Sequence, residues 1–129
     1  MSLQRLNPQT VAAPLGPYSQ GVVAPAAGRW LHVAGQVGIR PDGSLAQGFE
    51  AQAEAAWQNL LNVLDAAGMD AGDLVKVTTF VTDAAQVKLL GPVRARFLGE
   101  SRPASTLLVV PALAHPDWLV EVEAVACRA

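Results

Sequence analysis

Two apolar segments near the start of the chain have the composition of β-strands. Residues 18–25 and 29–39 are rich in valine, tryptophan and other residues that favour extended structure. Only the short sequence AAG separates them, so the pattern predicts a hairpin. An Asp-Gly pair within RPDGSL, residues 40–45, then predicts a turn.

The apolar spacing changes over residues 49–67. There the apolar residues recur at steps of three and four, which predicts an amphipathic helix; they are Ala53, Trp57, Leu60, Leu64 and Ala67. Gly68 follows in the position where helices commonly end with a left-handed residue. The helix is therefore expected to end there.

Alternation returns over residues 73–83 and predicts another strand. One of its faces is expected to carry Val75, Val77, Thr79 and Val81. Asp83 and Gln86 then have the spacing of a capping box. Because Gly91 and Pro92 interrupt the following segment, we expect a short turn up to residue 90 and a second helix with Pro92 at its first position.

Residues 105–111 and 118–127 predict the last two strands. The order strand-strand-helix-strand-helix-strand-strand indicates an α+β fold in one domain, 1–129. Such a two-layer fold leaves one face of the sheet uncovered. The run LLVV, however, has no polar alternation, so both of its faces are apolar. Self-association is the simplest way to cover the second face, and we expect an oligomer.

Composition narrows the class of protein further. The chain is 51% apolar with a net charge of −2, and its nine basic residues are scattered, which argues against a nucleic-acid partner. The longest apolar run is interrupted by Pro111 and is too short to cross a membrane. We see no export signal, and the single cysteine, Cys127, is typical of a reducing compartment. A cytoplasmic location is expected.

Few residues suggest chemistry by pattern alone. Glu121 and Glu123 alternate onto one face of the last strand, where Glu121 could act as a general base or both could be solvated. Ser105 lacks the G-x-S-x-G turn of a nucleophile, and no motif links it to either histidine. The two histidines and one cysteine do not have metal-ligand spacing, so no metal site is expected.

Six segments together resemble the YjgF/RidA family, also called the L-PSP endoribonuclease family. They are APLGPYSQGV (13–22), VAGQVGI (33–39), NLLNVLDAAG (59–68), LVKVTTFVTD (74–83), RPAST (102–106) and LVEVEAVA (119–126). The resemblance implies a chorismate-mutase-like fold with a mixed sheet and two helices on one face. It also implies a homotrimer whose sheets form a central barrel, with pockets in the clefts between subunits. The family activity so implied is hydrolysis of enamines and imines without metal or organic cofactor.

The resemblance assigns site residues one by one. Tyr18 stands at the family's pocket tyrosine, Gly35 at the glycine whose N–H faces a ligand carboxylate, and Glu121 at the glutamate that would activate water. Ser105 stands where the family motif P-A-R has its carboxylate-binding arginine, and with Thr106 it would line the pocket. Two other positions also depart from the family pattern, with Ala34 in place of serine and Gly91 in place of asparagine.

Replacing arginine by serine removes a charge and a planar pair of donors that match a carboxylate. The loss should weaken binding of amino-acid-derived imines by about 10- to 100-fold. Arg94, Arg96 or Arg102 could supply the charge instead, the first two by reaching across a subunit cleft; the group 94–97 is otherwise interpreted as a solvated helix face. Two functions stay open. One is a cofactor-free deaminase acting on a non-standard substrate, and the other is a trimer that binds a small metabolite without turnover.

Overall fold

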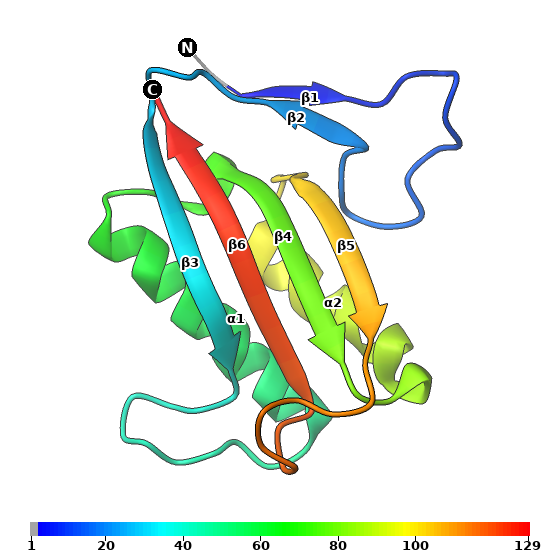
Figure 1. The fold of residues 1–129 in the computed structure, drawn as a ribbon, viewed down its shortest axis with the longest axis vertical. Helices are drawn as coiled ribbons and strands as arrows, with labels where there is room; N and C mark the ends of the chain where they lie inside the picture. The colour runs from blue at the N-terminus through cyan, green and yellow to red at the C-terminus, as the bar shows by residue number, and fades with distance from the viewer. Residues whose placement is uncertain (1–2) are drawn as a thin grey trace.

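A computed structural model describes residues 3–129 of the protein. Its elements are β1 (Gln4–Leu6), β2 (Gly21–Val23), β3 (Arg29–Val37), α1 (Phe49–Ala66), η1 (Ala71–Asp73), β4 (Leu74–Val81), η2 (Ala84–Leu89), α2 (Leu90–Leu98), β5 (Ala104–Val109) and β6 (Val120–Arg128). Figure 1 shows both α-helices on one face of a four-stranded sheet. The predicted α+β fold is confirmed.

The main sheet has the strand order β3-β6-β4-β5 and is mixed. Strand β6 runs antiparallel to both β3 and β4, whereas β4 and β5 are parallel. A parallel pair needs a crossover connection, and η2 with α2 provides it. The crossover places α2 beside β5, at one edge of the sheet. This edge is where the candidate site lies.

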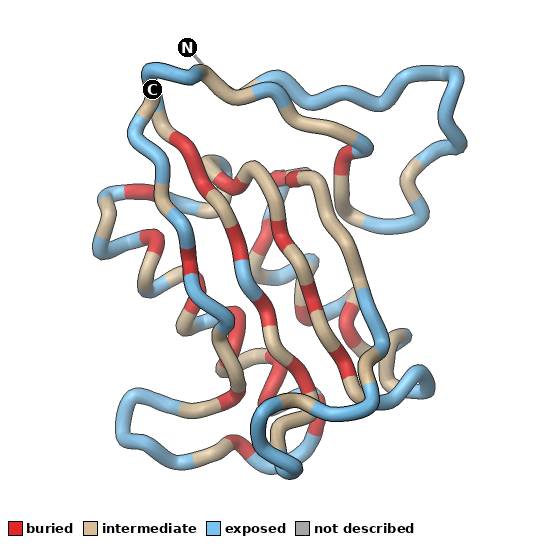
Figure 2. The backbone as a smooth tube through the Cα atoms, viewed as in Figure 1, coloured by how far each residue is buried: buried red, intermediate tan, exposed pale blue. Residues whose placement is uncertain are grey.

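The hydrophobic core lies between the sheet and its two helices, where buried residues alternate along the strands (Figure 2). Trp57, Leu60 and Leu64 of α1 are at most 1% exposed, and Val81 and Val122 of the sheet are fully buried. Burial of one such aliphatic side chain contributes about 1.5–3 kcal/mol. The packing of α1 on the sheet therefore stabilises the fold through the apolar positions that the helical spacing identified.

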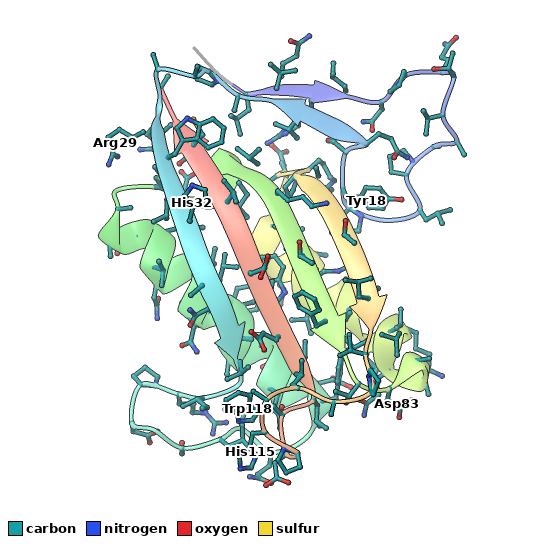
Figure 3. All side chains as sticks on the ribbon, viewed as in Figure 1. Tyr18, Arg29, His32, Asp83, His115 and Trp118 are labelled. Carbon is teal, nitrogen blue, oxygen red and sulfur yellow. The ribbon has the colours of Figure 1, made fainter. Side chains whose placement is uncertain are left out.

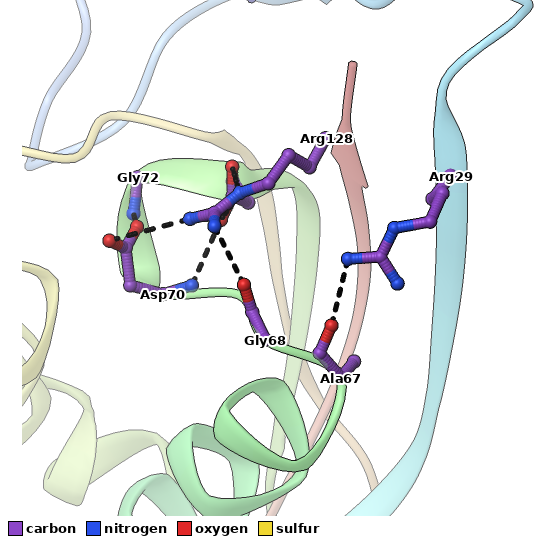
Figure 4. Close-up of polar contacts among 7 residues, drawn as sticks. Arg29, Ala67, Gly68, Asp70, Gly72 and Arg128 are labelled. Atoms are coloured by element: carbon purple, nitrogen blue, oxygen red, sulfur yellow. Dashed lines mark hydrogen bonds and ion pairs between the residues drawn. The ribbon is translucent and has the colours of Figure 1, made fainter.

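The end of α1 follows the sequence prediction closely. The helix ends at Ala66, and Gly68 has a φ of 72°, in the left-handed region. Two arginines then bind the last carbonyl groups: Arg29 donates to Ala67 O at 2.9 Å and Arg128 to Gly68 O at 2.7 Å (Figure 4). These bonds attach the helix end to the edge strand β3 and to its neighbour β6.

The predicted hairpin between residues 18–25 and 29–39 is wrong. Strand β2 pairs with β1, a strand that the sequence pattern did not reveal, and β3 pairs with β6. Between β2 and β3 the chain turns, with Gly28 N–H donating to Pro25 O at 3.2 Å. The buried Cys127 of β6 packs against this turn, with its Sγ 3.7 Å from Pro25 O. The long-range pairing of β3 therefore replaces the local one.

The second helix also differs from the prediction in its start. Asp83 accepts a hydrogen bond from Ala85 N at 2.9 Å and begins η2, from which α2 continues directly at Leu90. Pro92 is thus the third helical residue rather than the first. Proline is tolerated there because the N–H groups of a first helical turn have no partner within the helix.

Strand β4 has an irregularity near its start. Its register with β6 shifts between Leu74 and Lys76. Leu74 is therefore buried with Val77, while Val75, expected on that face, is only half-buried. Strands β5 and β6 begin and end within two residues of the predicted bounds.

Candidate functional site

A cavity lies beside β5, on the helix side of the sheet. Its volume is about 350 Å³, and its walls include Leu15, Tyr18, Val87, Arg94, Ser105 and Leu107. Ser105 and Leu107 reach it because they pair with Val77 and Thr79 of β4, two buried residues that face the helices. Figure 3 shows Tyr18 beside β5, on the loop that precedes β2. Two of the five predicted site residues, Tyr18 and Ser105, therefore share one cavity.

Backbone contacts hold Tyr18 at this edge. The next residue, Ser19, forms an isolated parallel bridge with Ala104, and its N–H donates to Pro103 O at 2.9 Å. The Tyr18 hydroxyl accepts a hydrogen bond from Leu15 N at 3.1 Å. Because the phenol oxygen acts there as an acceptor, its own O–H can donate to a ligand.

Arg94 of α2 also lines this cavity; the sequence leaves it open as a replacement for the missing charge or as part of a solvated helix face. It is half-buried rather than on a solvated helix face, and its Nε is buried without a hydrogen-bond partner among the described residues. Burial lowers the pKa of the guanidinium below its usual value. The side chain reaches the cavity of its own chain, whereas from the sequence it could reach a pocket across a subunit cleft.

The other two arginines considered as replacements have different partners. Arg96 is exposed and pairs with Glu54 at 3.0 Å. Arg102 donates to Gly99 O at 2.8 Å and to Ser101 O at 2.7 Å, at the end of α2. Neither lines the cavity beside β5. Of the three arginines, Arg94 alone stands beside Ser105 there.

Glu121 and Gly35 lie next to each other on the opposite face of the sheet. The register of β3 with β6 shifts between Val33 and Gln36, so Gly35 sits at a bulge. A Cβ atom at Gly35 would overlap Glu121 Oε2. The absence of a side chain at position 35 is therefore what allows the carboxylate to lie across β3, where it lines a second hollow with Phe80 and Leu113.

Thr106 also lies on this open face, because it pairs with Thr78 rather than with a helix-facing residue. Its hydroxyl accepts a hydrogen bond from Lys76 Nζ at 2.5 Å. Adjacent residues of a strand point to opposite faces, so Thr106 and Ser105 cannot line the same cavity within one chain. The five predicted residues thus lie on two faces of the sheet.

A further hollow, of about 360 Å³, lies between the loop after β3 and the outer side of α1. Several of its polar side chains are already paired. Glu54 binds Arg96, and the Asn59 amide donates to Val37 O at 3.2 Å and to Ile39 O at 2.7 Å. Arg40 also lines this hollow, but it is exposed, unlike the half-buried Arg94.

The described residues, 3–129, contain neither a cluster of metal-ligating side chains nor a helix that could span a membrane. Within this range, no three acidic, histidine or cysteine side chains gather as ligands for a metal ion. No helix in the same range has the length and apolar character needed to cross a membrane.

Comparison with known proteins gives matches over nearly the whole chain. The profile of the family described as endoribonuclease L-PSP matches residues 9–128. A RutC family protein of Pyrococcus horikoshii is 36% identical over 117 residues, covering 89% of this chain and 90% of its own. The 2-iminobutanoate/2-iminopropanoate deaminase of Salmonella typhimurium is 32% identical and covers 93% and 94%. A solved Rid family structure from Yersinia pestis has a TM-score of 0.88 at 33% identity, covering 99% and 100%.

Proposed function

Because this chain belongs to the YjgF/RidA family, described by the endoribonuclease L-PSP profile, we propose that it hydrolyses reactive imines or enamines to carbonyl compounds and ammonia. Relatives named as deaminases of 2-imino acids and of reactive intermediates support this assignment. The observation that carries it in this chain is the cavity beside β5, where Tyr18 and Ser105 meet at the positions that the family resemblance assigned to ligand binding.

The hydrolysis needs a group that accepts a proton from water and residues that bind the substrate. Water adds to the carbon of a C=N bond, the nitrogen takes up a proton, and the resulting carbinolamine expels ammonia to leave C=O. Glu121 is the proposed base that removes a proton from the attacking water. A carboxylate on the open face is accessible to water, since this face is not covered by a helix (Figure 1).

In one chain, Glu121 and the cavity at Tyr18 lie on opposite faces of the sheet. A second copy of the chain must therefore bring a Glu121 to that cavity. We place the complete site in a cleft between subunits of a homotrimer, with Gly35 and Thr106 contributed to it from the open face. A cytoplasmic location, expected from the single cysteine, is part of the same proposal.

Binding without turnover is the second candidate. The observation that favours it is the separation of Glu121 from the cavity within one chain. Assembly could bury a ligand between Tyr18 and Ser105 and still leave the Glu121 carboxylate out of reach of that ligand. The two candidates share a ligand site and differ only in whether Glu121 reaches it.

An assay coupled to an amino-acid oxidase distinguishes them. The oxidase generates 2-imino acids, and release of 2-oxo acid and ammonia is followed with and without the protein. We expect acceleration by the native protein and a fall of about 10²- to 10⁴-fold in Glu121→Gln, the usual contribution of a general base.

Glu123→Gln is the matched control, because Glu123 lies on the same face two residues away and is exposed. It should change the rate by less than threefold. No acceleration by the native protein, together with saturable ligand binding, would favour the binding protein. Full activity in Glu121→Gln would remove Glu121 from the mechanism.

A further inference from the structure

Arg94 is an unusual arginine in this structure. It is half-buried, its Nε has no partner among residues 3–129, and none of the ion pairs within that range includes it. Arg29, Arg96, Arg102 and Arg128 each bind a carbonyl or carboxylate group, and the remaining two arginines, Arg5 and Arg40, are exposed to solvent. A cation removed from water without a partner lowers stability. An anion bound beside such a half-buried cation would offset this cost.

The surroundings of Arg94 supply donors and apolar surface but no negative charge. Tyr18 O–H and Ser105 O–H are both available to donate, and none of the cavity-lining side chains is acidic. The guanidinium and the tyrosine ring both flank Gly16: a Cβ atom built on this glycine would be 3.9 Å from Arg94 Nη2 and 3.9 Å from Tyr18 Cδ2. Leu15, Val87 and Leu107 form the remaining wall.

We propose that Arg94 binds the carboxylate of the ligand, from helix α2 rather than from strand β5, and that the ligand is a monocarboxylate with an apolar side chain. Tyr18 and Ser105 donate further hydrogen bonds to the same ligand, and Leu15, Val87 and Leu107 contact its side chain. With the proposed function, on which this choice of ligand rests, the substrates are 2-imino acids with apolar side chains. The sequence expectation that Ser105 disfavours carboxylates is thereby reversed.

The position of the charge also favours larger side chains. An arginine at position 105 would extend from β5 into the cavity, whereas serine is short and leaves that volume open. Arg94 enters from the helix wall instead. A cavity of about 350 Å³ is at the lower end of the range for small-molecule sites and exceeds what the smallest imino acids fill. Branched apolar side chains should therefore bind more tightly than a methyl group.

The test measures binding of stable product analogues, so that it does not depend on turnover. The probes are 4-methyl-2-oxopentanoate and its methyl ester, titrated calorimetrically into the native protein and into Arg94→Met, Arg94→Lys and Arg96→Met. We expect the native protein to prefer the acid over the ester. Arg94→Met should weaken binding of the acid by about 10- to 100-fold, leaving the ester unaffected.

The other variants distinguish an effect of the positive charge on binding from an effect on folding. Arg94→Lys should bind the acid with intermediate affinity, because lysine keeps the charge but not the paired donors. Arg96→Met should match the native protein, since Arg96 is exposed and lies outside the cavity. Arg94→Met should melt no lower than the native protein, because it removes an unpaired buried charge.

Moving the charge gives an independent check. In the double variant R94M/S105R the guanidinium would again extend from β5, and affinity for the acid should return to within about tenfold of the native value. The proposal is overturned if the native protein binds acid and ester equally or binds neither. It is also overturned if Arg94→Met binds the acid like the native protein. Acid binding that depends on Arg94 without any imine hydrolysis would sustain this inference and reject the proposed function alone.

Discussion

At the scale of single residues, the candidate site depends on one short side chain, at Ser105, and on the absence of a side chain at Gly35. The short side chain of Ser105 leaves the cavity beside β5 open to Arg94, and glycine at position 35 leaves room for the Glu121 carboxylate. The sequence shows both residues. It does not reveal what occupies the freed space, since Arg94 is 11 residues from Ser105 in sequence and Glu121 is 86 residues from Gly35.

Gly35→Ala should test the position of Glu121. The new methyl group would overlap Oε2, the end of a flexible side chain, so the carboxylate should move while the fold is kept. We expect imine hydrolysis to fall at least tenfold with little change in melting temperature. Ala34→Ser is the control, because Ala34 is exposed and adjacent. Equal activity in Gly35→Ala and the native protein would show that this arrangement of Glu121 is unimportant.

At the scale of elements, local signals predicted α1 well and the early strands badly. Helix α1 satisfies its hydrogen bonds within itself, and its apolar stripe and Gly68 were both visible in the sequence. A strand must find a partner elsewhere. The link between β2 and β3 is short enough for a hairpin, but the pairing of β3 with β6 prevailed because it completes the four-stranded sheet over the core.

Two glycine substitutions provide a matched pair at this scale. Gly68→Ala places a Cβ atom on a left-handed residue and should lower the free energy of unfolding by about 1–2 kcal/mol. Gly91→Ala lies within α2, where an added Cβ meets nothing within 4 Å, and should raise it by up to about 1 kcal/mol. Urea titration measures both. A Gly68→Ala variant as stable as the native protein would contradict the argument for the end of α1.

At the scale of the whole molecule, the open face of the sheet is the main unexplained surface. It carries Trp30 and Leu108, each 43% exposed, together with the half-buried Phe80 and Val125. Figure 1 shows no helix on this side. Large exposed apolar residues gathered on one face are typical of an interaction surface. The expected trimer would bury them, and it would join the two halves of the candidate site.

Light scattering after gel filtration tests the assembly. We expect the mass of three chains rather than the 13.5 kDa of one. Leu108→Asp should shift the population toward the single chain, because assembly would bury the new charge without a partner. Arg96→Met, on the helix side, should not. A native protein that runs as a single species of 13.5 kDa would exclude the trimer and the shared site.

The sequence by itself determined the α+β class, the extent of α1, and the alternation of Glu121 and Glu123 along the last strand. These features depend on residues near each other in the chain or on the identity of a single residue. Only the tertiary structure decided that β3 pairs with β6, that Ser105 and Thr106 face opposite sides, and that Arg94 stands unpaired beside Ser105. Each of these depends on which distant segments pack together, and packing is selected by burial over the whole core.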